Sequence, residues 1–435
     1  MERVLVKNLS VVPSGQKVQV AGFVQFVRDQ KRMQFVVLRD HTGLVQLCHE
    51  KGGEGDNLQL GISSLTPESA LAISGQVVVN PTIKLGGMEI VIDSLIIVDR
   101  AETPLPITDE SSSDLQQDWR ALSLRRPENN LIFRVQTTLE RAMREFWEQQ
   151  GFIQIHSPKL MGAASESGSE LFQLEYFGQK ASLAQSPQFY KQMAMAAGFD
   201  RVFEIGPVFR ANPSFTSRHD TEFTSIDAEM SWIESHDEVM EFEEAWLQHA
   251  IGQVSQTHGE EIKECFGVDV IVPSLPFPRI QLSEARQILA DCGHVIEHKS
   301  DLDPPGERGI ADYIAKKFSH EFVFVTDYPI DVRPFYHMRH ENDPTLTKSF
   351  DLLWRGLEIT TGAQREHRID VLKKQAVEKG IELDSIKHYI DFFRYGCPPH
   401  GGFGAGLTRL LMVLLDHKNV REVTYLYRGP NRLTP

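Results

Sequence analysis

Three basic side chains gather around one predicted hairpin. A run rich in β-branched and aromatic residues, 202–209, is typical of a strand, and a weaker strand pattern covers 224–232. Arg210 stands at the end of the first strand, and Arg218 and His219 follow in the polar loop. Because guanidinium groups hold phosphate and carboxylate groups through paired hydrogen bonds, this spacing predicts an anion-binding site. A surface hairpin with solvated arginines is the alternative.

Two carboxylates follow later in the chain, within the segment SFDLLWRGLEITTGAQREHR. Asp351 and Glu358 flank a strand-like run there, and Thr361 adds a hydroxyl group. Carboxylate oxygens beside a phosphate site are ligands for Mg²⁺, so the segment predicts magnesium binding. Arg365 is predicted on a turn or first helical turn after the strand. The alternative is an ordinary strand, turn and helix.

A glycine-rich stretch, 401–406, precedes an apolar helix with Arg409 in its first turn. Glycines let the backbone approach a ligand closely. The spacing is not a dinucleotide fingerprint, and too few residues remain after it for a Rossmann unit. No Gly-Lys-Ser/Thr follows, which excludes a P-loop.

Composition limits the class of protein. The 435 residues are 41% hydrophobic and 24% charged, which is typical of a globular protein with two or three domains. No long apolar run or signal peptide is visible, so no membrane span is expected. Four scattered cysteines favour a reducing, cytoplasmic location. The net charge of −15 argues against nucleic acid, but residues 1–100 hold ten basic and ten acidic residues, so they are not acidic.

The first hundred residues show short strand-like runs separated by turn residues. These runs are 18–27, 34–38, 44–48, 73–79 and 89–98. Five strands in this length predict a small closed β-barrel of the oligonucleotide-binding (OB) type. Phe23, Phe26 and Phe35, with basic residues nearby, form a candidate stacking face for single-stranded bases. The alternative is that these rings fill the barrel core.

A linker rich in Pro and Ser is predicted for 105–130. Beyond it, apolar periodicity predicts a helix over 132–150 that Gly151 ends, and then a strand over 152–155 that stops before Pro158. This edge suits either packing or a subunit interface.

The segment LAQSPQFYKQ predicts a helix that starts at Ser186-Pro187. Gln188 and Lys191, three residues apart, would share one face of it. A solvated helix face is the alternative. Glu170 lies upstream in SGSELF, and the small polar residues 165–169 suit a loop over a site.

In chain order, these segments resemble the three signature motifs of the class II aminoacyl-tRNA synthetases. Residues 151–160 resemble the first motif, 209–223 the second and 402–409 the third. Within that class the chain is similar, over nearly its whole length, to aspartyl-tRNA synthetases of the archaeal and eukaryotic type. The segments that carry this similarity are SGSELF, LAQSPQFYKQ, FEIGPVFRA, FDLLWRGLEITTGAQREH and FRYGCPPHGGFGAGLTR.

The resemblance implies an α+β fold. Residues 1–104 would form a five-stranded OB-type anticodon-binding barrel, 105–130 a hinge, and 131–435 a class II catalytic domain with an antiparallel sheet flanked by helices. The implied enzyme is an aspartate–tRNA ligase. It would join L-aspartate to ATP, release pyrophosphate and transfer the aspartyl group to the 3′ end of a tRNA. A homodimer without membrane attachment is also implied.

The resemblance implies a nucleotide site made mainly of basic and aromatic side chains. Arg210 would hold the α-phosphate and the substrate α-carboxylate. Arg218 and His219 would hold the γ-phosphate, while Phe223 and Arg409 would sandwich the adenine. The residues implied in ATP binding are Arg210, Asn212, Arg218, His219, Phe223, Glu358, Gly404, Gly406 and Arg409. Those implied in catalysis are Arg210, Glu358 and Arg409, and those implied in Mg²⁺ binding are Glu358, Thr361 and, in second rank, Asp351.

For the amino acid, the resemblance implies that Lys191 and Arg365 pair with the side-chain carboxylate and Glu170 with the amino group. The full implied set is Glu170, Gln188, Lys191, Arg210, Thr361 and Arg365. A buried cation selects a carboxylate over an amide because an unpaired buried charge is costly. We therefore expect Lys191→Met to abolish aspartate activation while leaving the fold intact.

The sequence departs from the family pattern at three places. Asn212 stands where the second motif usually has an acidic residue, which puts its ATP contact in doubt. Thr361 replaces a more common serine and keeps the hydroxyl. The usual tail LFPRD appears as YLYRG at 425–429, for which the residues offer no account.

The tRNA partner depends on the third anticodon base. The residues implied in anticodon binding are Phe23, Gln25, Phe35 and Lys84. Gln25 stands where strict enzymes often carry tryptophan, whereas Lys84 matches them. We hypothesise relaxed specificity, with tRNA(Asp) and also tRNA(Asn) as partners. An asparaginyl-tRNA synthetase, another adenylate-forming amino-acid ligase and an inactive RNA-binding paralogue are the alternatives, and the last is disfavoured by the presence of Arg210, Glu358 and Arg409.

Overall fold

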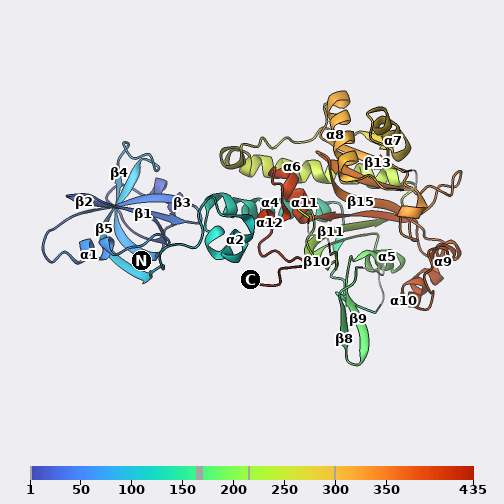
Figure 1. Cartoon of the computed structure of the whole chain (residues 1–435), viewed down its shortest axis with the longest axis horizontal. Helices are drawn as coiled ribbons and strands as arrows, with labels where there is room; N and C mark the ends of the chain where they lie inside the picture. Colours follow the sequence, from blue (N-terminus) through green and yellow to red (C-terminus); the bar gives the residue numbers. More distant parts are fainter. Residues whose placement is uncertain (1, 163–169, 214–215, 298–299) are drawn as a thin grey trace. The chain divides into compact units, whose positions relative to one another are not determined.

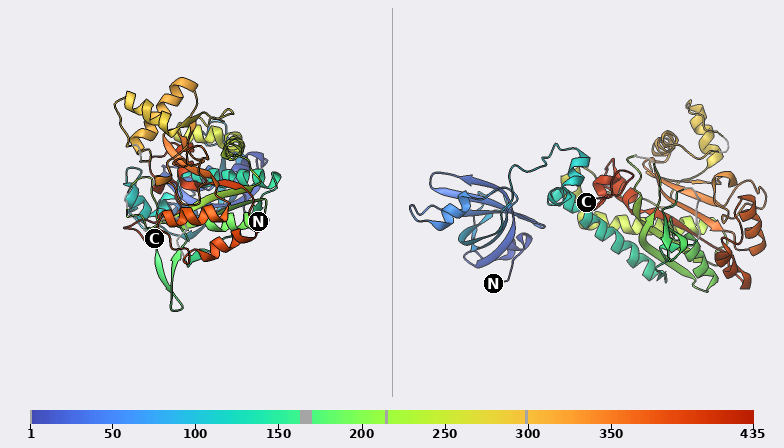
Figure 2. Two further views of the ribbon diagram at one scale, coloured as in Figure 1. Left: turned by 90° about the vertical axis from the view of Figure 1, so that its right-hand side faces the viewer. Right: turned by 60° about the horizontal axis from the view of Figure 1, so that its bottom comes forward.

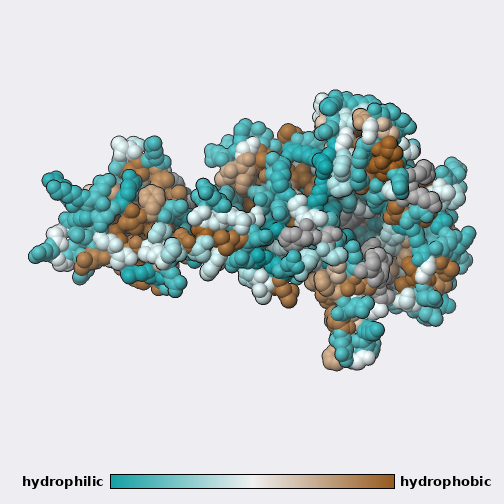
Figure 3. All heavy atoms as spheres, in the orientation of Figure 1, coloured by the Kyte–Doolittle hydropathy of each residue, from teal (hydrophilic) through white to brown (hydrophobic). Residues whose placement is uncertain are grey.

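A computed structural model describes residues 2–162, 170–213, 216–297 and 300–435 (Figure 1). The chain divides into two compact units, Met1–Asn130 and Leu131–Pro435. The use of 105–130 as a hinge stays a prediction. Polar side chains cover much of the face seen in Figure 3, with apolar groups scattered among them. No helix of the described residues is long and apolar enough to cross a membrane.

The first unit contains a closed five-stranded barrel with strand order β1-β2-β3-β5-β4, which confirms the predicted OB-type architecture. The strands are β1 (Lys17–Asp29), β2 (Met33–Asp40), β3 (Gly43–Glu50), β4 (Ala70–Val79) and β5 (Met88–Asp99). The β3–β5 pair is parallel and the other neighbours are antiparallel. The helices described in this unit are η1 (Val6–Val11), α1 (Asn57–Ser63), α2 (Ser113–Asp118) and α3 (Arg120–Ser123).

The barrel core is aliphatic, and the phenylalanines stay outside it. Phe26 is 42% exposed, while Phe23 and Phe35 are half-buried. The register of β1 against β2 shifts between Val24 and Phe26, so Gln25 is an extra residue there. Such a bulge reverses the inward–outward alternation, which turns Phe26 outward after the buried Val24. The alternative that these rings fill the core is therefore wrong.

The second unit is built on an eight-stranded sheet with order β12-β13-β14-β15-β16-β11-β10-β6. Its strands are β6 (Ile153–Gln154), β10 (Arg201–Phe209), β11 (Glu222–Ser231), β12 (Arg279–Gln281), β13 (Phe322–Thr326), β14 (Ser349–Trp354), β15 (Leu357–Arg365) and β16 (His400–Gly406). The central strands are antiparallel, as expected, while the edge strands β6 and β12 pair in parallel. A second sheet, β7 (Leu160–Met161), β9 (Gln179–Leu183) and β8 (Gln173–Tyr176), ends in a hairpin that projects from this unit (Figures 1 and 2).

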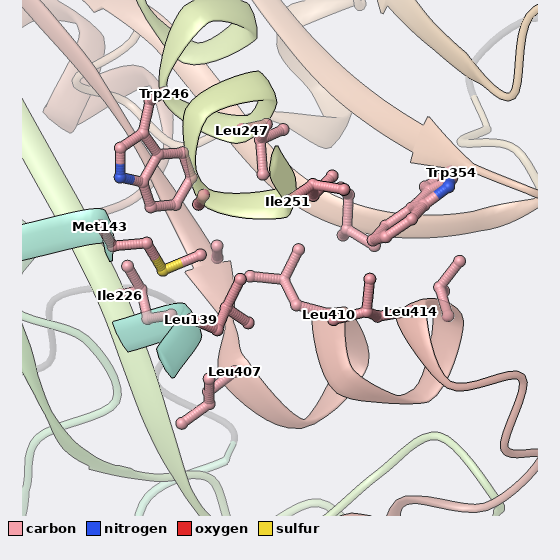
Figure 4. Close-up of a cluster of buried hydrophobic side chains, with 14 of the residues drawn as sticks. Leu139, Met143, Ile226, Trp246, Leu247, Ile251, Trp354, Leu407, Leu410 and Leu414 are labelled. Carbon is pink, nitrogen blue, oxygen red and sulfur yellow. The ribbon is translucent and has the colours of Figure 1, made fainter. Parts of the chain in front are cut away.

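Three helices bury one face of the large sheet. They are α4 (Pro127–Gln149), α6 (His236–Phe266) and α11 (Leu407–Leu414). Figure 4 shows Trp246 of α6 and Leu410 of α11 pointing into the same apolar layer. Gly151 follows α4 at a φ of +78°, as its predicted role in ending that helix requires. The remaining helices are α5 (Gln188–Ala196), α7 (Leu282–Asp291), α8 (Pro304–Phe318), η2 (Ile330–Val332), α9 (Ile369–Glu378), α10 (Lys387–Ile390), η3 (Asp391–Tyr395) and α12 (Val420–Val423).

One local prediction from the sequence, the placement of Arg365, is wrong, and one stretch for which no element was predicted is a strand. The glycine-rich stretch 401–406 is part of strand β16 and pairs with β11 and β15 on its two sides. A Cβ on Gly402 would meet the carbonyl oxygen of Ala228 at 2.1 Å, so glycine is required for that strand to fit. Arg365 ends strand β15 and is not on a turn, because β15 continues in register with β16 as far as this residue.

Candidate active site

Side-chain alternation on the central strands separates the apolar core from a polar face. Ile226 and Ala228 of β11 and Phe403 of β16 belong to the core. Because side chains along a strand point alternately to opposite faces, Asp227 and Glu229 of β11 point away from that core. Both carboxylates are nevertheless buried. The polar face of the sheet therefore carries buried charge, which requires partners.

A cavity of about 340 Å³ lies on this polar face. It collects predicted residues from five separate segments of the chain. Those that line it are Glu170, Gln188, Arg210, Asn212, Arg218, His219, Phe223, Glu358, Thr361, Arg365, Gly404, Gly406 and Arg409. Lys191 and Asp351 are not among the described lining residues. The predicted loop at 165–169 lies outside the described residues.

Arg210 is an available guanidinium group at the cavity. It follows the last residue of β10, and its backbone N–H donates to the carbonyl of Thr221 at 2.9 Å, which continues the β10–β11 hairpin. Its guanidinium carbon lies 5.5 Å from the centre of the Phe223 ring. Within the described part of the chain, Arg210 forms no ion pair. This positive charge is therefore free to meet an anion in the cavity.

The other two basic groups of the hairpin are less free. Arg218 Nη1 donates to Glu307 Oε2 of α8 at 2.9 Å. Burial, with the nearby Arg409 and Arg210, lowers the pKa of His219 below its ordinary value. His219 is therefore largely neutral at pH 7, and its Nδ1 lies 2.5 Å from the Thr216 hydroxyl. The sequence predicted three basic groups here, and two of them, Arg210 and Arg218, are positively charged at pH 7.

Glu358 is the carboxylate held beside Arg409. Arg409 Nη1 donates to the Glu358 carbonyl oxygen at 3.0 Å and lies 3.5 Å from Oε1. The Thr361 hydroxyl donates to the same Oε1 at 3.1 Å. Mg²⁺ usually takes one or two carboxylates, with phosphate and water completing six oxygens, and this pair fits that role. No group of three or more His, Cys, Asp or Glu in the described residues could hold a metal by itself.

Asp351 already has a counter-ion. Arg333 Nη2 donates to Asp351 Oδ2 at 2.6 Å, and both side chains are buried. The guanidinium of Arg333 also lies 3.7 Å from the centre of the Tyr328 ring. Because this pairing neutralises Asp351, Glu358 is the one of the two predicted magnesium carboxylates that lines the cavity.

Lys191 and Arg365 lie in one buried ion-pair network. Lys191 Nζ donates to Asp227 Oδ1 and to the carbonyl of Phe403, each at 3.0 Å, and lies 3.3 Å from Glu229 Oε2. Arg365 Nε donates to Glu229 Oε1 at 3.0 Å. Each of the two basic side chains is 2% exposed. Two cations are thus matched by two carboxylates.

This network corrects two sequence-based expectations. The alternative of a solvated face for Gln188 and Lys191 is wrong, because both residues are buried. The picture of an unpaired buried cation is also wrong. Burial by itself raises the pKa of Glu229, but Arg365 and Lys191 outweigh it and hold that pKa below its ordinary value. Glu229 is therefore ionised and compensates them.

Several site residues were missed by sequence reasoning. Asp227 and Glu229 alternate with apolar residues along β11, and this period of two was the signal that could have found them. Arg333 and His337 also line the cavity but lie in an irregular segment that carries no such signal. Asp220 is buried in the cavity wall, and burial raises its pKa to about 7.

The predicted anticodon residues lie in the first unit and not at the cavity. Gln25 and Lys84 are exposed, in β1 and in the turn between β4 and β5 respectively. One face of the Phe23 ring is covered by Arg125, whose guanidinium carbon lies 3.8 Å from the ring centre. Phe35 is half-buried, with Arg28 at 5.8 Å from its ring centre.

Two protein families match the two units. Residues 112–428 match the class II tRNA synthetases for D, K and N, that is, aspartate, lysine and asparagine. Residues 18–98 match the OB-fold nucleic acid binding domain.

Individual relatives match over nearly the full length. The aspartate–tRNA(Asp) ligase of Thermococcus kodakarensis is 42% identical over 426 residues, which is 97% of each chain. The aspartate–tRNA(Asp/Asn) ligase of Aeropyrum pernix is 39% identical over 97% of this chain and 96% of its own. The solved asparaginyl-tRNA synthetase from Pyrococcus horikoshii, complexed with asparaginyl-adenylate, superposes with a TM-score of 0.93 at 32% identity, covering 100% of both chains.

Proposed function

This chain belongs to the class II aminoacyl-tRNA synthetases of the aspartate, lysine and asparagine group, and we propose that it is an aspartate–tRNA ligase whose cavity makes aspartyl-adenylate. The observation that carries the proposal is the convergence of Arg210, Glu358 and Arg409, from distant segments, on one cavity. Relatives named aspartate–tRNA ligases support the choice of amino acid.

The first step joins two anions, so it needs charge neutralisation more than covalent help. A carboxylate oxygen of aspartate attacks the α-phosphorus of ATP, the bond to the β-phosphate oxygen breaks, and pyrophosphate leaves. Arg210 forms no ion pair with the residues that the structure describes, and we assign it to the α-phosphate and the attacking carboxylate. In the second step the tRNA 3′-terminal hydroxyl attacks the acyl carbon and AMP leaves.

The nucleotide would lie along the hairpin side of the cavity. We assign Phe223 and Arg409 to the two faces of adenine, because an aromatic ring and a planar guanidinium both stack on a base. Arg218 and His219 are assigned to the γ-phosphate, and a bound phosphate would raise the pKa of His219. Gly404 and Gly406 leave space for the nucleotide, and Asn212 lines the same wall.

A magnesium ion fits beside the phosphates. Glu358 and Thr361 would hold it, with Asp351 as the second-rank ligand, and when bound it supplies positive charge to the phosphate oxygens. The side chains themselves keep Glu358 pointing to the cavity, since Thr361 and Arg409 both contact its Oε1.

Aspartate would occupy the end of the cavity lined by Gln188 and Arg365. We assign Arg365 to its side-chain carboxylate and Glu170 to its amino group. Lys191 does not line the cavity, and we assign it to act on the substrate through Asp227 and Glu229. Because the two cations are already compensated, asparagine is the second candidate substrate, as in the solved P. horikoshii relative.

As partners we propose tRNA(Asp), tRNA(Asn) and a second copy of the chain. The short edge strand β6 exposes Ile153 on a free sheet edge, which suits a homodimer interface. A cytoplasmic location is proposed from the scattered cysteines.

ATP–pyrophosphate exchange, measured with each of the twenty amino acids, tests the substrate. We expect exchange with aspartate and at most weak exchange with asparagine. Exchange only with asparagine would assign the second candidate, and none with any amino acid would reject adenylate formation. Aminoacylation of tRNA(Asp) and tRNA(Asn) transcripts side by side then tests the RNA partner. Charging of tRNA(Asp) alone would reject the hypothesis of relaxed tRNA specificity.

A further inference from the structure

The C-terminal segment 420–428 lies against loop 216–221, the loop that carries Arg218 and His219 at the cavity. Three hydrogen bonds join the two segments, and each has a backbone carbonyl oxygen as its acceptor. They run from the Val420 N–H to Ser217 at 2.9 Å, from the Tyr427 hydroxyl to His219 at 3.1 Å, and from the Thr221 N–H to Arg428 at 3.0 Å. The loop is therefore supported by residues that lie far from it in the chain.

Thr221 connects this support to the anion site. Its N–H donates to the C-terminal segment, while its own carbonyl accepts from the N–H of Arg210 at 2.9 Å. The end of the loop is thus fixed on both sides. The hydrogen bond to the His219 carbonyl fixes the backbone two residues earlier, where the imidazole and the neighbouring Arg218 side chain begin.

Tyr427 is itself a rigid support. Its side chain is 1% exposed and belongs to the apolar core of the second unit. The guanidinium carbon of Arg421 lies 5.1 Å from the centre of its ring. A buried tyrosine usually directs its hydroxyl to a hydrogen-bond partner, and here that partner is the loop. The ring therefore has no room to move without breaking the contact with His219.

Gly429 leaves the space in which the phenol lies. A Cβ on this residue would lie 2.6 Å from Cε1 and 2.7 Å from Cζ of Tyr427, and closer still to the hydroxyl oxygen. The backbone of Gly429 lies outside the left-handed region, so its conformation alone would accept other residues. The glycine is therefore needed for the Tyr427 side chain and not for its own backbone.

This contact accounts for the unusual tail YLYRG. Tyr427 and Gly429 stand where the tail LFPRD carries proline and aspartate. Proline has no hydroxyl to hold the loop, and aspartate has the Cβ that the phenol excludes. The two departures from the family pattern are therefore one coupled change.

We propose that Tyr427 is a positioning residue for ATP: its hydroxyl fixes loop 216–221 so that Arg218 and His219 meet the γ-phosphate. Gly429 completes the arrangement by leaving room for the phenol. This deepens the proposed function and rests on its assignment of the two basic residues to that phosphate. Tyr427 does not line the cavity, so it acts on the nucleotide only through the loop.

The test is isothermal titration of the full-length protein with ATP and with ADP, in the presence of Mg²⁺ and without an amino acid. The two nucleotides differ only in the γ-phosphate. Tyr427→Phe removes the hydroxyl and keeps the ring in the core. It should weaken ATP binding about three- to tenfold and leave ADP binding within about twofold of the wild type. A general loss of structure would weaken both nucleotides alike.

The matched control is Tyr425→Phe, which removes a hydroxyl from a tyrosine two residues away that is 61% exposed. It should leave the affinities for both nucleotides within about twofold of the wild type.

A double-mutant cycle tests the coupling of Tyr427 to Gly429. Gly429→Ala places a Cβ against the phenol and should lower the melting temperature by about 3–8 °C. In the background of Tyr427→Pro the ring is absent, and the same change should cost at most about 2 °C more.

Equal weakening of ATP and ADP by Tyr427→Phe, or no weakening of either, would overturn the inference. An equal loss of melting temperature from Gly429→Ala in both backgrounds would overturn the coupling. Nucleotide binding needs no aspartate, which separates this inference from the catalytic proposal. The predicted ATP shift without aspartate-dependent exchange would support the inference and overturn the ligase proposal alone, whereas normal exchange with an unshifted ATP affinity in Tyr427→Phe would do the reverse.

Discussion

Replacing Lys191 by methionine tests the buried ion-pair network and the choice of substrate together. The change removes a buried ammonium group that contacts Asp227 at 3.0 Å and Glu229 at 3.3 Å. Two buried carboxylates then share one remaining cation, Arg365. Breaking a buried pair by removing one partner typically costs about 3–5 kcal/mol. The network therefore changes the expectation of an intact fold: we expect a melting temperature lower by on the order of 10 °C.

The assay must separate lost stability from lost recognition. The double variant Lys191→Met/Asp227→Asn removes one positive and one negative charge and keeps the pair between Arg365 and Glu229. We expect it to regain most of the stability, to within about 2 kcal/mol of the wild type. Its aspartate-dependent pyrophosphate exchange should nevertheless stay at least a hundredfold below that of the wild type, because the ammonium group is still missing.

A matched control is Lys263→Met, which breaks an exposed pair with Asp269. It should cost less than about 1 kcal/mol and leave exchange unchanged. Calorimetry and pyrophosphate exchange on all four proteins decide the outcome. Normal exchange in the stable double variant would refute the role of Lys191 in selecting aspartate, and an unchanged melting temperature in Lys191→Met would refute the network.

Three other predictions follow from the site and the core. Arg210→Lys should lower kcat for aspartate-dependent exchange at least a hundredfold, with a melting temperature within about 2 °C of the wild type, because Arg210 forms no ion pair with the described residues. Equal activity would contradict its assigned role. Burial raises the pKa of Glu243 to about 8, so the folded state holds this proton more tightly than the unfolded state. The free energy of unfolding should therefore fall by a few kcal/mol as pH rises from about 5 to about 8, and Glu243→Gln should remove this fall; the same slope in the variant would exclude Glu243 as its source. Asp220, with its pKa near 7, should ionise beside the phosphate site above neutral pH. The KM for ATP should then rise above pH 7 in the wild type and stay constant in Asp220→Asn. Parallel pH profiles of the two proteins would exclude Asp220 as the cause of the rise.

Local pattern predicted the elements of this fold well. Runs of β-branched residues separated by turn residues predicted the barrel strands. The same pattern predicted the hairpin that carries Arg210. The amphipathic period of α4 and the glycine that ends it also act within a few residues. These are local effects, and a single sequence displays them.

The partners of buried charges could not be predicted in the same way. Lys191 meets Asp227 and Glu229 only because α5 packs near β11, and that contact joins residues far apart in the chain. Likewise the residues of β16 show no strand pattern of their own, since what excludes a Cβ at Gly402 is the backbone of Ala228. The alternation along β11 indicates that Asp227 and Glu229 share one face, but no local pattern indicates which cation meets them.

The grouping of the candidate residues around one cavity could be predicted only in part. The motif order suggested it through resemblance, while the strand alternation of β11, β15 and β16 supplies its physical cause. Arg333 and His337 enter the same cavity from an irregular segment, and neither could be expected from pattern or spacing.

The central claim is that the cavity holds an aminoacyl-adenylate and prefers an acid to an amide. Isothermal titration of the protein with two stable sulfamoyl analogues, one of aspartyl-adenylate and one of asparaginyl-adenylate, measures this preference without turnover. We predict that the aspartyl analogue binds at least a hundredfold more tightly, and that Arg210→Lys weakens both analogues. Equal affinities, or tighter binding of the asparaginyl analogue, would contradict the assignment to aspartate.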